Sequence, residues 1–433
     1  MVLMLMSIFA EAQQITPAEN VFNFTLEECI EYALHNNYNR QSMYLDKSLR
    51  EVSYTQSKQE KLPSVSASAS QSLTNTPGTD ANKATVWGGN YGVNANMTLY
   101  NGGTINTTIE QNKLIVEQTD SQNKQYDNQL SISIIQAFLS ALGNDELLKL
   151  QETLLKTSEE QMLQGKEQLR AGAILESDYL LLESQYESDK YNVVNTQITR
   201  NNNLLTLKNL LSMSPMQKLN IVYPDTSIIH RMAIMPELPE VVSISLETMP
   251  DIQISKYSVD IANLNIKLSK AGFMPKLNLS AGVGTGYSSL SGNSWGSQLS
   301  KGFNEQAGLS LSIPIFSNSR NKSNVQQSQI RLKQTELQQN QTELEVMQKV
   351  EQEYYNMISA YNKYVASNTK QNAYKASFDA YGQQFKAGAI TTVDLLLQQN
   401  NYISVINDFV QNKYTFILNR KILDVYMGIP VQL

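Results

Sequence analysis

Two segments in each half of the chain alternate apolar and polar residues with the period of two that β-strands show. The odd-numbered residues from Val65 to Ala69 are apolar and alternate with serines, and those from Val93 to Leu99 alternate with asparagine and threonine. The same alternation returns at Leu277 and at Leu309. It predicts four strands, at about residues 62–72, 87–100, 275–289 and 303–316.

The segments between these strands have helical spacing of apolar residues and almost no glycine or proline. One predicted helix spans residues 25–60, and another spans residues 176–212. The helix from about Gly103 to Gln168 covers some 66 positions, roughly 100 Å at about 1.5 Å per residue. The corresponding helix of the second half has a coiled-coil-like packing face. Its members are Val350, Tyr354, Met357, Tyr361 and Tyr364.

An internal repeat relates the two halves of the chain. The sequence from Leu169 to Ile174, with Asp178 downstream, is answered by the sequence from Phe385 to Ile390, with Asp394 downstream, at an offset of 388 − 172 = 216. We therefore expect a first structural repeat at 24–212, a connector at 213–249 and a second repeat at 250–428. Each repeat is predicted to contain a helix, a β-hairpin, a long helix, a sharp turn and a further helix.

The predicted turns contain glycine where a helix C-terminus favours a left-handed residue, at Gly172 and Gly388. In the second copy, Thr391 and Asp394 have the spacing of a capping box, and Asp178 holds the matching place in the first copy. This structural role is sufficient to explain both carboxylates, which lie where the helix dipole favours a negative charge.

The strand regions contain almost no charge. Between Leu62 and Tyr100 the only charged residues are Asp80 and Lys83. Small polar residues on one face, apolar residues on the other and aromatic residues near the strand ends are typical of a transmembrane β-barrel, although a soluble β-domain remains an alternative. Four strands cannot close a membrane barrel, and open edges are not tolerated in lipid, so several chains would have to share one barrel.

Composition excludes several classes of function. The 433 residues are 41% hydrophobic and 17% charged, with a net charge of −6, one cysteine and two histidines. A disulfide framework or a Cys/His zinc cluster is therefore impossible within one chain, and no basic face for nucleic acid is expected. The sequence has no Gly-rich phosphate loop or nucleophile elbow, so we expect no enzyme, no catalytic residue, no metal and no cofactor. Cys29 is expected to be a small buried helix residue.

Residues 1–12 form a short apolar run that ends on Ala10-Glu11-Ala12. This pattern predicts a signal peptide, which we expect to be truncated because it lacks a preceding Lys or Arg. A buried N-terminal strand is the alternative. No other segment has the 18 or so consecutive apolar residues of a transmembrane helix.

The duplicated order of elements and the paired turns together resemble the TolC family of outer-membrane efflux channels. The resemblance extends from about Phe24 to Gly428. It implies a mixed α and β membrane protein in the bacterial outer membrane, in which a long antiparallel α-helical barrel extends into the periplasm. Four strands per chain would form a twelve-stranded transmembrane β-barrel in a homotrimer, surrounded by outer-membrane lipid.

The same resemblance implies a passive exit duct for small molecules or polypeptides, gated at its periplasmic tip. The tip turns would dock a periplasmic adaptor protein of a tripartite system with an inner-membrane pump. Asp394, and less strongly Asp178, are expected at the pore constriction; the second acidic position of the family is Leu397 here, and Leu181 in the first half. An envelope-anchored structural or adhesive rod is the alternative function. The expected docking residues are Arg170, Ala171, Gly172, Ala173, Lys386, Ala387, Gly388 and Ala389.

Overall fold

The computed structural model describes residues 21–75, 85–223 and 235–429, so the predicted signal peptide at 1–12 lies outside the described residues. The chain divides into two compact units, each built from both halves of the sequence. The first unit takes its described residues from 1–41, 126–248 and 347–433, and the second consists of those in 42–125 and 249–346. None of the described helices combines the length and the apolarity needed to cross a membrane.

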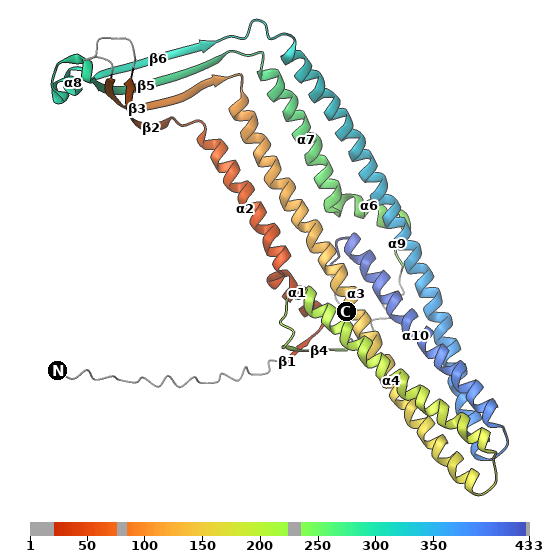
Figure 1. Ribbon diagram of the computed structural model, residues 1–433. Helices are drawn as coiled ribbons and strands as arrows, with labels where there is room; N and C mark the ends of the chain where they lie inside the picture. The colour runs from red at the N-terminus through yellow and green to blue at the C-terminus, as the bar shows by residue number, and fades with distance from the viewer. Residues whose placement is uncertain (1–20, 76–84, 224–234, 430–433) are drawn as a thin grey trace, which may run out of the picture. The chain divides into compact units, whose positions relative to one another are not determined.

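The second unit contains a four-stranded antiparallel sheet in the order β2-β3-β5-β6 (Figure 1). The strands lie within a few residues of the predicted ranges, because long alternating runs fix both the position and the face of a strand. Between β5 and β6, the expected loop contains a short 3₁₀ turn, η1 (Ser289–Ser291), and a short helix, α8 (Trp295–Lys301). The strands are β2 (Ser64–Asn75), β3 (Thr85–Asn101), β5 (Lys276–Ser288) and β6 (Asn304–Ser312).

Each strand of the sheet is joined to one helix of the same unit. Figure 1 shows these helices side by side in the order α2, α3, α7, α9, which is the order of their strands. Side-chain bonds connect the neighbours: Lys47 to Asp120 between α2 and α3 (2.7 Å), and Gln111 to Asn265 between α3 and α7 (2.8 Å). The helices are α2 (Tyr38–Gln59), α3 (Thr104–Arg170), α7 (Pro250–Ala271) and α9 (Arg320–Lys386).

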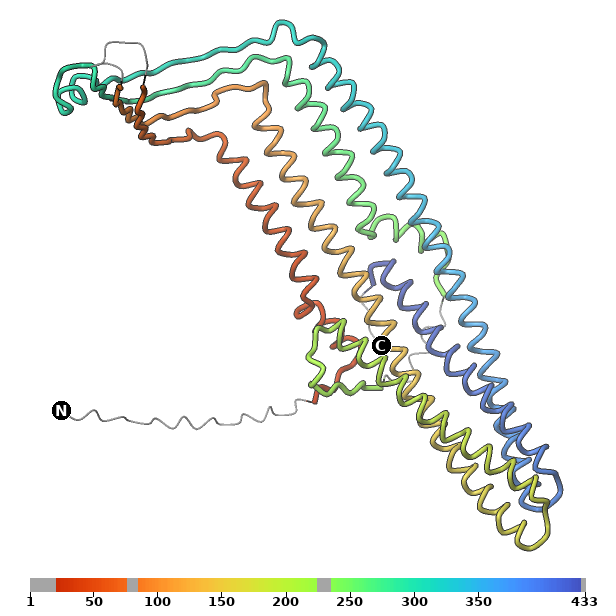
Figure 2. Tube along the Cα trace, viewed as in Figure 1, coloured from red at the N-terminus to blue at the C-terminus, as the bar shows by residue number. Residues whose placement is uncertain are grey.

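The first unit contains the remaining lengths of α3 and α9, which form helical hairpins with α4 (Glu176–Leu210) and α10 (Thr392–Tyr426). Figure 2 traces both hairpins. Its core is built from the predicted apolar stripe of α3, including Ile135 and Leu142, and from aromatic packing between α9 and α10, where the Tyr361 ring lies 5.2 Å from that of Phe416. The tyrosine pattern is therefore a packing face. The unit also contains α1 (Leu26–Asn36), α6 (Leu238–Thr248) and a parallel pair of strands, β1 (Val21–Phe24) and β4 (Lys218–Ile221).

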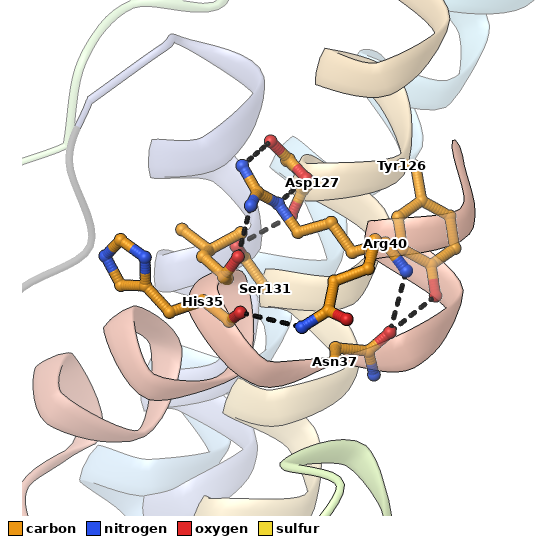
Figure 3. Close-up of polar contacts among 8 residues, drawn as sticks. His35, Asn37, Arg40, Tyr126, Asp127 and Ser131 are labelled. Atoms are coloured by element: carbon orange, nitrogen blue, oxygen red, sulfur yellow. Dashed lines mark hydrogen bonds and ion pairs between the residues drawn. The ribbon is translucent and has the colours of Figure 1, made fainter. Parts of the chain in front are cut away.

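The helix predicted at 25–60 is wrong in one respect, because it breaks at Asn37 into α1 and α2. The backbone of Asn37 is extended, with φ −66° and ψ 121°. Its side chain accepts a hydrogen bond from the backbone N–H of Arg40 and donates one to the carbonyl of Leu210, so it caps the new helix and is anchored to the end of α4. Arg40 forms an ion pair with Asp127 on α3 (Figure 3).

The helices of the two halves have equal lengths. The long helices α3 and α9 each have 67 residues, and α4 and α10 each have 35. The α1–α2 pair has 11 and 22 residues, and so has the α6–α7 pair. The helix α6 lies within the segment predicted as a connector, 213–249, and matches α1 in length.

Candidate functional site

The turn between α3 and α4 is closed by a left-handed glycine, as predicted. Gly172 has φ +71°, and a Cβ added there would meet no atom within 4 Å, so only the backbone requires glycine. The N–H of Gly172 donates to the carbonyl of Leu169 (3.0 Å), and the N–H of Ala173 donates to that of Gln168 (2.8 Å). These two bonds form a Schellman motif, which satisfies the carbonyls at the end of α3.

The turn between α9 and α10 has the same geometry. Gly388 also has φ +71°, and the bonds from Gly388 to Phe385 (3.0 Å) and from Ala389 to Gln384 (2.9 Å) repeat the Schellman pattern. The tip residues in both turns are exposed. Arg170 ends α3 and forms an ion pair with Glu167 at 2.8 Å, and Lys386 ends α9.

The two predicted gate carboxylates cap the helices that follow the turns. Asp394 accepts a hydrogen bond from the backbone N–H of Thr391 (3.3 Å) and one from its hydroxyl (2.7 Å), and Thr391 accepts one from the N–H of Asp394 (3.2 Å). The predicted capping box is therefore confirmed. Asp178 accepts a weaker bond from the N–H of Leu175 at 3.4 Å. Both carboxylates have a structural role, and their place at a pore constriction stays a prediction.

Apolar side chains are exposed around both turns. Leu397, at the second acidic position that the resemblance implies, is 56% exposed. Leu181, its counterpart, is also exposed. Several exposed apolar side chains near one turn suit a contact surface. The other members are Leu175, Leu180 and Val393.

The four-stranded sheet has one apolar and one polar face. On the apolar face Val93 pairs with Ala67 and Val283, and Leu279 pairs with Met97 and Leu309. The polar residues on that face lie near the strand ends: Gln71, Asn75, Thr85, Thr285 and Glu305.

From Gly88 onward in β3 and in the other strands, the opposite face consists of serine, asparagine, glycine, glutamine and threonine, with Lys276 at the start of β5. Ser66, for example, pairs with Asn94, which pairs with Gly282. The expected separation of small polar from apolar positions is confirmed. Such a sheet presents one face suited to lipid and one suited to water.

Aromatic residues mark both ends of the apolar face. At one end, Trp87 Nε1 donates to the Tyr287 hydroxyl (2.7 Å) and to Gln71 Oε1 (3.2 Å). At the other, a β-bulge between Thr98 and Tyr100 sets Tyr100 opposite Leu277. The 100 − 87 = 13 residue steps from Trp87 to Tyr100 correspond to about 43 Å along a strand, or about 30 Å across a membrane at a tilt of about 45°.

A partly buried joint that the sequence did not reveal connects α3 to α10. Glu146 forms an ion pair with Lys413 (2.8 Å) and accepts a hydrogen bond from the Tyr414 hydroxyl (2.6 Å). The Tyr414 ring lies against Gly143, where a Cβ would approach Cδ2 to 3.0 Å. Burial, followed by the bond to Glu146, raises the pKa of Tyr414 well above its ordinary value. The only sequence signal was Gly143 inside a long helix.

The neighbouring carboxylate of Asp145 anchors two other elements to α3. It pairs with Arg200 on α4 (2.5 Å) and accepts a hydrogen bond from the hydroxyl of Tyr223, which follows β4. Burial acts to raise the pKa of Asp145, but the bonds from Tyr223, Lys149 and Arg200 outweigh it, so the pKa is lowered. Partners this far apart in sequence cannot be found from local patterns.

The fold and the paired turns define a class of mixed α and β proteins that contain both long helical hairpins and a two-faced sheet. Residues 241–428 match the family model described as Outer membrane efflux protein. This match, together with the relatives below, confirms the resemblance stated from the sequence: the chain is similar to the TolC-like outer-membrane efflux proteins.

Curated relatives and solved structures agree with this placement. The chain is 20% identical over 322 residues to the alkaline protease secretion protein AprF of Pseudomonas aeruginosa, covering 72% of this chain and 64% of AprF. It is 22% identical over 323 residues to the outer membrane protein TolC of Escherichia coli K12, covering 71% and 61%. The chain thus spans just under two thirds of the length of these relatives.

The fold is similar to that of CusC, with a TM-score of 0.81 at 18% identity, covering 94% of this chain and 92% of CusC. The open state of the outer membrane channel MtrE of Neisseria gonorrhoeae gives a TM-score of 0.78 at 20% identity, covering 93% and 89%. The predicted outer-membrane location agrees with the names of the family model and of these relatives, which are outer-membrane proteins.

Proposed function

We propose that the chain forms, as a homotrimer, a passive exit duct of the outer membrane in a tripartite efflux or secretion system. The observation that carries the proposal is the sheet of four strands, which is apolar on one face and polar on the other. Membrane barrels need at least about eight strands, so one chain cannot close. Three copies supply twelve strands, with the polar face turned to a water-filled lumen.

The edges of the second unit support association between copies. Within the described residues, β2 and β6 each pair with a single strand, so each leaves one edge open. The helices adjoining these edge strands carry exposed apolar stripes: Leu45, Leu49 and Val52 on α2, and Ile330, Leu337 and Leu344 on α9. Spacings of three, four and seven residues are those of helix packing. We infer that β2 and α2 of one copy pack against β6 and α9 of the next, in a ring.

The tip turns are the proposed gate and docking surface. Their exposed apolar side chains and paired basic residues, Arg170 and Lys386, suit contact with an adaptor protein that connects the duct to an inner-membrane pump. Asp394 is the proposed acidic residue of the constriction. Its capping bonds to Thr391 fix the carboxylate at the first turn of α10.

Single-channel conductance of the purified full-length protein in planar bilayers tests the function. We expect discrete conductance steps, and we expect Asp394→Asn to raise the frequency of opening and lower the preference for cations, since it removes the negative charge from the tip. Glu187→Gln, an exposed change on α4, serves as a control. No conductance from correctly folded trimers, even with the tip variant, would leave the structural rod as the better account.

A further inference from the structure

A buried carboxylate connects the two helical hairpins of the first unit. Asp189 lies on α4 and is only 3% exposed. It accepts a hydrogen bond from Gln399 Nε2 on α10 (2.9 Å) and one from Gln185 Nε2, one turn earlier on α4 (2.9 Å). Within the described chain, Asp189 takes part in no ion pair. Neutral partners alone compensate a buried charge poorly, so the ionised form is costly here.

The internal repeat supplies a comparison for this position. At the offset of 216 that relates Asp178 to Asp394, the counterpart of Asp189 is Val405. Val405 is equally buried, at 3% exposed, on α10. An apolar side chain therefore fills the equivalent place, and packing does not require a carboxylate. A buried carboxylate kept where valine suffices indicates a role other than packing.

The side-chain amide of Gln399 has a hydrogen-bond partner for its nitrogen but none for its oxygen. Gln399 is fully buried, and its Oε1 has no hydrogen-bond partner while its Nε2 donates to Asp189. Turning the amide over would place Nε2 where Oε1 now lies, so one polar atom of Gln399 stays unpaired in either orientation. The contact between Asp189 and Gln399 is therefore incompletely satisfied in the packed state.

The charged residues on the surrounding helices do not lower the cost of ionising Asp189. Burial raises the pKa of Asp189, and the hydrogen bonds from Ser158, Gln185 and Gln399 act in the opposite direction without cancelling it. No charged group contributes. On α10 the nearest charged residues are Asp394 and Asp408, both exposed. The charged residues at this level of the other helices are also exposed: Lys156, Glu159 and Glu160 on α3, Glu187 and Lys190 on α4, and Lys375 and Asp379 on α9.

We propose that Asp189 and Gln399 form a proton-operated latch between the α3–α4 and α9–α10 hairpins, closed when Asp189 is neutral and loosened when it is ionised. The proposal rests on the proposed gating of the duct at the tip turns. At pH values between the ordinary carboxyl pKa and the raised pKa of Asp189, the state with packed hairpins binds one proton more than the state with separated hairpins. The contact is therefore most stable at low pH, and this stability is lost as the pH rises through the raised value.

The rest of the hairpin interface allows such a movement. One turn beyond Asp189 begins a groove of about 650 Å³, lined mainly by asparagine, glutamine and threonine from α3, α4 and α10. It reaches Tyr414, beside the ion pair of Lys413 with Glu146. This ion pair connects α3 to α10 away from Asp189, so it can act as a pivot. An ionised Asp189 can take up water from the groove side when the hairpins part.

Hydrogen–deuterium exchange of the full-length protein tests the latch independently of transport. After correction for intrinsic rates, protection of residues 185–193 and 395–403 should fall by up to tenfold per pH unit between the ordinary and the raised carboxyl pKa. Asp189→Asn and Asp189→Val, which both remove the charge, should keep high protection at all pH values. Glu187→Gln should behave as the wild type. Equal pH dependence in the wild type and both Asp189 variants overturns the latch.

Conductance in planar bilayers at pH 5 and pH 7.5 connects the latch to gating. The wild type should open several-fold more often at pH 7.5, whereas Asp189→Asn should open rarely at both values. If all variants conduct with the same pH dependence, the latch is wrong and the duct stands. If exchange shows the expected protection but no variant conducts, the duct is wrong, and with it the role of the latch in gating.

Discussion

Gly172 and Gly388 show how strongly single positions constrain the tip of each hairpin. Both residues occupy the left-handed region, and neither has an atom within 4 Å of an added Cβ. A substitution there is opposed by backbone strain alone, which is about 1–2 kcal/mol for an L-residue. The turn geometry could be predicted from the sequence, because glycine between two helices has few other roles.

The prediction at this scale compares two glycines of one hairpin. Gly388→Ala should lower the local stability of the turn by about 1 kcal/mol, since alanine disfavours a positive φ. Gly382→Ala, inside α9 with equally open space, should raise helix stability by up to about 1 kcal/mol. Amide exchange of the last turn of α9 measures both. Destabilisation by both substitutions, or by neither, would contradict the assigned conformations.

Asp189, Asn37 and Glu146 show what the sequence could not predict. Asp189 meets Gln399 at a separation of 210 residues, and Glu146 meets Tyr414 at 268. Asn37 breaks a helical pattern because the backbone of Leu210 and Arg40 and the hydroxyl of Tyr126 satisfy its side chain. A polar residue on a long helix has the same local signature whether it is solvated or buried. Only the tertiary partner distinguishes the two cases.

The strands and long helices are the elements that the sequence predicted well. Their patterns persist over many residues, so the face of each strand follows from the parity of its positions. The bulge before Tyr100 was not predicted, since Leu99 fits the same alternation in sequence. The bulge matters because it sets the aromatic ring of Tyr100 opposite Leu277.

The two faces of the sheet lead to a prediction for adjacent residues of β3. Val93→Lys places a charge at the middle of the apolar face, where lysine costs about 2–4 kcal/mol in lipid, so little trimer should reach the membrane fraction. Asn94→Lys points to the polar face and should assemble normally, with ion selectivity shifted toward anions. Gel analysis of unheated membranes gives the yield of trimer. Equal yields for the two variants would contradict the assignment of the faces.

At the scale of the whole molecule, the proposed membrane-spanning unit is incomplete in one chain. Its four-stranded sheet leaves an edge of β2 and an edge of β6 unpaired among the described residues, and lipid does not tolerate such edges. The apolar stripes on α2 and α9 are likewise uncovered. Both features are explained together if identical copies associate in a ring.

Disulfide crosslinking between these edges tests the central claim, the shared barrel, most directly. Each variant carries one cysteine in place of Ser68 on β2 and a second cysteine at one of the positions from Gln306 to Ser310 on β6. Each variant is then oxidised in membranes. Native Cys29 should stay out of the reaction, since it is fully buried and burial raises the pKa of its thiol to about 12. The account predicts, for at least one pair, a covalent product with the mass of three chains and none larger. Products that stop at the monomer for every pair, or that extend beyond three chains, would contradict it.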